Sequence, residues 1–178
     1  PLVVFASEAD LAIPDLHKGA PYTMLGGIRP WDLLFYGACI IAGTLGISLF
    51  LRHQVKKLRA HESMLKVAET IFQTCRTYLI QQGKFLILLF LFIAPAIAFY
   101  FLALKGEGVP TLLLVLLFSV VGMGGSYSVA WYGIRINTYA NARTAFASLA
   151  GKPWDVVNIP LRSGMSVGLF LISLELVM

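Results

Sequence analysis

The acidic side chains are the groups in this sequence that could hold a divalent cation and, through it, act on phosphates. Mg²⁺ takes oxygen ligands, so such a site needs several carboxylates close together. The sequence contains nine acidic residues, and no two of them have the i, i+4 spacing that would pair them on one face of a helix. We therefore predict no metal site and no catalytic residue in this chain. The nine are Glu8, Asp10, Asp15, Asp32, Glu62, Glu69, Glu107, Asp155 and Glu175.

Other groups capable of chemistry are equally scattered. No glycine-rich stretch continues into the Gly-Lys-Ser/Thr of a nucleotide-binding loop. The histidines His17, His53 and His61 stand alone in polar segments, where we interpret them as solvated surface residues. Cys39 lies in an apolar run and Cys75 on an amphipathic segment, so we expect two buried small side chains rather than a disulfide framework or a metal site.

Glu175 falls in the apolar stretch that ends the chain. A carboxylate inside a bilayer is costly, and by default it indicates an ion path or a buried partner. The alternative is that the helix ends nearby and the side chain reaches the outer interface. A helix from Gly164 to Met178 covers only about 22 Å, so we favour the interfacial position.

The most informative stretch is 133–144, with the sequence GIRINTYANART. Trp131 and Tyr132 precede it and are typical of a membrane interface, and two arginines follow. Arg143 can bind a carboxylate or phosphate through two donors, as can Arg135. We interpret the stretch as a helix that leaves the membrane.

Composition shows which elements must position these residues. The sequence is 58% hydrophobic and 13% charged, with a mean hydropathy of +0.78, far from the usage of soluble domains. Apolar runs long enough to cross a bilayer occupy 31–51, 85–104 and 111–134, and a shorter one occupies 164–178. Barrel strands would alternate apolar and polar residues, which these runs do not. We predict an all-α membrane protein, a polytopic transmembrane helix bundle. Glycines recur in the runs, as expected where helices pack closely.

The basic residues predict the orientation. Segment 52–84 carries seven Lys/Arg against two Glu, and 135–163 carries four against one Asp, whereas the stretch before the first run is acidic. The positive-inside rule places both basic loops in the cytoplasm and the amino terminus outside. Residues 2–6 (LVVFA) could end a signal peptide, which agrees with that side. No basic stripe with interleaved aromatics indicates nucleic-acid binding.

Segment 62–84 is more than a loop. Its apolar residues recur at helical spacings, with charged residues on the other faces. We expect a cytoplasmic helical extension of the second membrane helix, kinked in the membrane at Pro95. The alternative is a basic helix lying on anionic lipid.

The stretch at 133–144 resembles the G-M-K-I-A-T-Y-A-N-A-R-T sequence of the ion-pumping membrane pyrophosphatases, with its T-Y-A-N-A-R-T core intact at 138–144. The order around 64–82 and 162–168 is similar to the starts of that family's second and fourth helices. Arg135 stands where the family has Lys, Asn137 where it has Ala, and residues 151–155 depart from its loop. The motif residues, which we expect to be structural, are Gly133, Arg135, Thr138, Tyr139, Asn141, Arg143, Arg162 and Gly164.

The resemblance implies a homodimer that hydrolyses pyrophosphate with Mg²⁺ and moves H⁺ or Na⁺ out of the cytoplasm, in a cell inner or plasma membrane or an acidic-organelle membrane. It implies that residues 1–178 are the N-terminal portion of one membrane domain, four outer-ring helices of a larger multi-helix fold. The Mg²⁺-binding carboxylates of the family lie on later, inner-ring helices, so this segment alone is expected to be inactive. The alternative is a non-catalytic membrane subunit whose cytoplasmic helix docks a partner.

Overall fold

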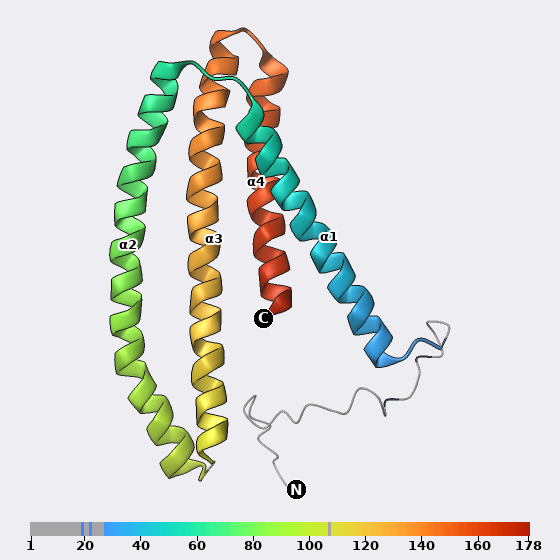
Figure 1. Ribbon diagram of the computed structural model, residues 1–178, viewed down its shortest axis with the longest axis vertical. Helices are drawn as coiled ribbons and strands as arrows, with labels where there is room; N and C mark the ends of the chain where they lie inside the picture. Colours follow the sequence, from blue (N-terminus) through green and yellow to red (C-terminus); the bar gives the residue numbers. More distant parts are fainter. Residues whose placement is uncertain (1–18, 20–21, 23–26, 107) are drawn as a thin grey trace, which may run out of the picture. The chain divides into compact units, whose positions relative to one another are not determined.

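The computed structural model describes residues 19, 22, 27–106 and 108–178. The signal-like segment 2–6, all three acidic residues before Asp32, His17 and Glu107 lie outside the described residues. The described part is all-α: α1 (Pro30–Lys57), α2 (Glu62–Phe99), a π-helical continuation η3 (Tyr100–Leu104), α3 (Val109–Leu149) and α4 (Pro153–Val177) (Figure 1). α1, α3, α4 and the continuous α2–η3 helix are each long and apolar enough to cross a membrane, which confirms the predicted fold class.

Local sequence explains where the helices begin. α3 and α4 start with a proline in the first turn, where its missing N–H is no loss. Gly106 and Gly151, with φ of 67° each, make the left-handed turns that precede them. At α2 the His61 ring accepts a hydrogen bond from the Ser63 backbone N–H (3.3 Å) and caps the helix.

The helices extend beyond the apolar runs. α4 begins at Pro153, whereas the fourth apolar run was expected to open near Gly164. α2 continues without a break through Gly83 to Phe99, as the helical spacing of segment 62–84 predicts. The structure therefore adds polar helical turns to the apolar segments, and the apolar runs give only the middle of each helix.

The chain divides into two compact units between Ala42 and Gly43, inside α1. In the first unit, Tyr22 and Ile28 form an isolated antiparallel bridge just before α1 begins. The second unit contains the rest of α1 with α2, α3 and α4. There, α3 packs against both α2 and α4 (Figure 1).

Burial in the second unit is concentrated in the carboxyl-terminal half of α3. The core cluster joins Val55 of α1, Ala140 and Ala147 of α3 and Ile159 of α4. The apolar part of α2 is different, since no residue of its most apolar 18-residue window is buried inside the molecule. Such an apolar surface requires a covering, and a bilayer supplies one.

The expectation that the two cysteines are buried was wrong. Cys39 is exposed and Cys75 only half-buried. The glycines do not all mark close helix contacts: a Cβ added at Gly122 or Gly124 would meet no other atom within 4 Å, whereas one at Gly125 would lie 2.6 Å from the sulfur of Met178.

Candidate functional site

Arg143 ties the end of α1 to α3. Its Nε donates to the carbonyl of Leu58 (3.0 Å), and Nη2 donates to the carbonyl of Lys56 (2.7 Å). Nη1 donates to the carbonyl of Tyr139, one turn earlier on α3 (2.9 Å). The last carbonyls of a helix lack partners within the helix and carry the negative end of its dipole. A guanidinium supplies both the missing donors and the complementary charge, so Arg143 is a C-terminal clamp for α1.

The clamp is buried on the water side of the membrane run. Arg143 is only 7% exposed, and it lies beyond Ile134, where the predicted membrane run ends. Burial lowers the pKa of its guanidinium, and the nearby Tyr139 raises it in part. An arginine side chain is not deprotonated in proteins, so Arg143 remains a charged donor. The guanidinium also lies 5.5 Å from the centre of the Tyr139 ring.

Arg135 joins α3 to α2. Its guanidinium lies 4.6 Å from the centre of the Phe72 ring and 5.8 Å from that of Tyr139. Phe72 also meets Trp131 edge to face, with the ring centres 6.4 Å apart. Tyr139 therefore stands between two arginines, each of which binds a different neighbouring helix.

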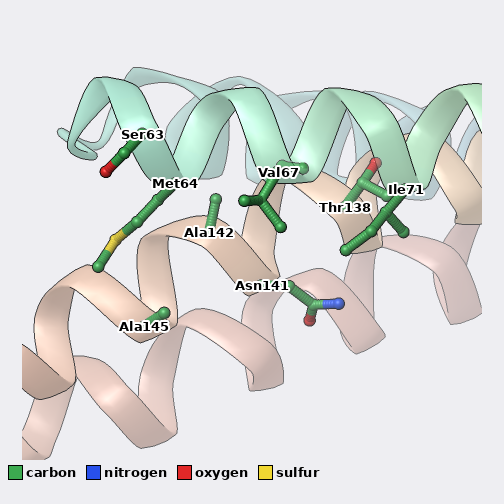
Figure 2. Close-up of a pocket in the computed structure, with 9 residues that line it drawn as sticks. Ser63, Met64, Val67, Ile71, Thr138, Asn141, Ala142 and Ala145 are labelled. Atoms are coloured by element: carbon green, nitrogen blue, oxygen red, sulfur yellow. The ribbon is translucent and has the colours of Figure 1, made fainter.

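A cavity of about 320 Å³ separates α2 from the T-Y-A-N-A-R-T turn of α3. Figure 2 shows Met64, Val67 and Ile71 of α2 on one side of the cavity and Ala142 and Asn141 of α3 on the other. Asn141 is exposed. No charged side chain contributes to its lining, so the cavity offers nothing to neutralise a phosphate. The lining residues are Ser63, Met64, Val67, Ala68, Ile71, Thr138, Asn141, Ala142 and Ala145.

The motif residues near α4 hold that helix against its neighbours. Gly133 is buried, and a Cβ built there would lie 3.6 Å from Val167, so α4 approaches α3 closely at this level. Arg162 donates from Nη1 to the side-chain oxygen of Gln54 on α1 (3.1 Å). Gly164 makes no such approach, since a Cβ there would meet no atom within 4 Å.

A buried hydroxyl network joins α1, α3 and α4 farther from the carboxyl-terminal end of α3 than the Arg143 clamp, and no sequence pattern indicated it. The hydroxyls of Tyr132 and Ser166 lie 2.7 Å apart, and that of Ser166 donates to the carbonyl of Ser48 (2.8 Å). The hydroxyl of Ser48 donates in return to the carbonyl of Ser166 (2.7 Å). Ser163 adds a bond to Asn137 (2.8 Å). In lipid, hydrogen bonds of this kind hold helices together.

The carboxylates do not converge. Glu175 is exposed near the end of α4. Within the described part of the chain, no three His, Cys, Asp or Glu side chains come together in a way that could hold a metal ion.

Three of the predicted motif residues thus contact three different neighbouring helices, while Thr138 and Asn141 line the apolar cavity beside α2. Arg143 binds the end of α1, Arg135 binds α2, and Gly133 receives α4. Such an arrangement fixes helices in place.

Comparison with known proteins gives two matches. Residues 42–178 match the family described as inorganic H⁺ pyrophosphatase. Over 141 residues, the chain is 45% identical to the K⁺-insensitive pyrophosphate-energized proton pump of Chlorobaculum tepidum; the match covers 79% of this chain and 19% of that protein. No solved structure matches. The chain therefore spans less than a fifth of the length of this curated relative.

Proposed function

Because this chain belongs to the inorganic H⁺ pyrophosphatase family, we propose that it forms part of a pump that couples pyrophosphate hydrolysis to proton export from the cytoplasm. The resemblance carried by T-Y-A-N-A-R-T is confirmed by the match over residues 42–178. The same match and the four apolar helices make the chain an integral membrane protein. H⁺ is preferred to Na⁺ as the transported ion, since the 45% identical relative is named a proton pump.

Within that pump, these helices act as a scaffold. The observation that carries this role is the Arg143 clamp, in which one buried guanidinium fixes the end of α1 to α3. Parts of the pump beyond this chain supply the hydrolytic site. The four helices belong to the outer ring of a homodimer, with the basic loops in the cytoplasm.

Mg²⁺, the cofactor expected for pyrophosphate, does not fit the residues described here. It takes clustered oxygen ligands, and the described part of the chain brings no three candidate ligands together. We therefore assign no residue of this chain to the metal. The family match also argues against the alternative of a separate docking subunit.

Coupling can be tested with the protein that carries this chain, reconstituted into sealed vesicles. Phosphate release from pyrophosphate should require Mg²⁺ and should accelerate when a protonophore removes the opposing gradient. ATP at the same concentration serves as the control substrate. A hydrolysis rate that does not change with the protonophore would contradict the pump proposal. The protein would then be a membrane hydrolase that does not transport protons.

A further inference from the structure

A groove of about 560 Å³ runs between α2 and α3, where the apolar run of α2 begins. α2 lines it from Ile80 to Phe90, and α3 from Val120 to Tyr127. The α2 side corresponds to about 15 Å along the helix axis. Its lining is almost entirely apolar, and Lys84 is the charged residue in it.

Two glycines shape this groove. At Gly83 the α2 backbone comes close to Tyr127, since a Cβ there would lie 3.0 Å from the tyrosine ring. The Tyr127 hydroxyl donates to the carbonyl of Leu79 (3.2 Å) and ties the two helices at this end. Gly124 also lines the groove, and a Cβ there would meet no atom within 4 Å. The absent side chain at Gly124 therefore leaves space that a ligand can fill.

The side chains that line the groove indicate what kind of molecule can bind there. Water is a poor filler because a buried water needs two to four polar partners. A hydrocarbon chain matches the apolar wall, and Ile87 presents 72% of its surface toward the surroundings. The Lys84 side chain is exposed, and within the described part of the chain no carboxylate forms an ion pair with it. It sits at the end of a segment with seven basic and two acidic residues. This charge attracts anionic lipid headgroups.

We propose that the groove binds one anionic phospholipid. Its acyl chain lies along the apolar wall beside Gly124, and its phosphate meets the ammonium group of Lys84. The site uses none of the residues of the Arg143 clamp, so it is independent of the proposed pump function. Lipid in this position fills the gap between α2 and α3.

The test is photo-labelling of the protein that carries this chain in phosphatidylcholine vesicles, with phosphatidylglycerol bearing a diazirine on its acyl chain. We expect cross-links on peptides containing Phe90 or Met123. Gly124→Leu fills the groove and should remove them. Gly122→Leu is the matched control, since the same side chain is added in open space outside the lining and labelling should persist. Equal labelling of the two leucine variants would overturn the proposal.

The contact between the lipid phosphate and Lys84 is tested separately. Lys84→Gln should lower labelling by phosphatidylglycerol about fivefold, the effect of one basic residue near an anionic surface, and leave a labelled phosphatidylcholine unchanged. Arg76→Gln, exposed on the same helix outside the groove, should change neither. No loss of phosphatidylglycerol labelling in Lys84→Gln would refute the charge contact.

Competition separates a lipid from a free phosphate. Unlabelled phosphatidylglycerol should displace the probe, and glycerol phosphate, the headgroup alone, should not. Displacement by glycerol phosphate would contradict the acyl-chain contact. If Gly124→Leu loses helical content by circular dichroism, Gly124→Ala replaces it and should reduce labelling in part; undiminished labelling of a folded Gly124→Ala would count against the site.

Discussion

Removal of the Arg143 side chain should release the last turn of α1. Two of its hydrogen bonds reach the carboxyl-terminal end of α1, at 2.7 Å to Lys56 in the last turn and 3.0 Å to Leu58 directly after it. A hydrogen bond from a charged donor contributes about 1.5–3 kcal/mol. We take the lower figure because the helix end lies near water, which gives about 3 kcal/mol for the pair. Arg143→Ala should therefore lower the free energy of opening this turn by about that amount.

Hydrogen exchange measures this opening locally, in the intact protein. Amides at the end of α1 should exchange about 100-fold faster in Arg143→Ala, the equivalent of about 3 kcal/mol. One of them is the amide of Leu58, directly after the helix, which donates to Val55 (3.3 Å). Arg143→Lys keeps the charge, but a lysine ammonium can reach only one of the two α1-end carbonyls. It should therefore restore about half of the lost protection from hydrogen exchange, on a logarithmic scale.

The control is Arg76→Ala, which removes an exposed arginine of α2 without touching α1. It should leave exchange at the end of α1 unchanged. Unaltered exchange in Arg143→Ala, together with unaltered pyrophosphate hydrolysis, would refute the clamp.

Three further predictions concern the network, the carboxylate and the topology. Tyr132→Phe keeps the ring stacked on Phe170 (4.3 Å between ring centres) but loses the hydroxyl. The free energy of unfolding in mixed micelles should therefore fall by about 1 kcal/mol. An unchanged free energy of unfolding would show that the network contributes nothing to stability. Glu175→Gln should leave proton transport unchanged, because the side chain is exposed near the end of α4, and abolished transport would instead indicate an ion path. A cysteine at Ser148 should react with a membrane-impermeant maleimide only from the cytoplasmic side, and one at Thr111 only from the opposite side; the reverse pattern would contradict the proposed orientation.

Sequence patterns were sufficient to predict which segments form helices, but not where each helix begins and ends. The spacing in segment 62–84 predicted the continuous α2, because one face of that helix repeats its apolar residues. Counting apolar residues missed the first turns of α4, since a helix outside lipid needs no apolar run. The Gly151-Lys152-Pro153 sequence followed by Asp155 is a recognisable helix start that would have found them.

The contacts that the motif residues make could not be predicted from the sequence. Arg143 binds backbone carbonyls, which every residue carries, so no residue type identifies its partners. The serines of the hydroxyl network look like neutral members of apolar runs until the fold brings Ser48 beside Ser166. The resemblance at T-Y-A-N-A-R-T did locate the turn where the helices are joined, and it gave the family that the match confirms.

The most direct test of the central proposal is a pH-sensitive dye inside vesicles that contain the protein carrying this chain. Adding pyrophosphate and Mg²⁺ outside should acidify the lumen, and a protonophore should abolish the gradient. A lumen that stays at its starting pH while pyrophosphate is hydrolysed at a steady rate would contradict proton pumping.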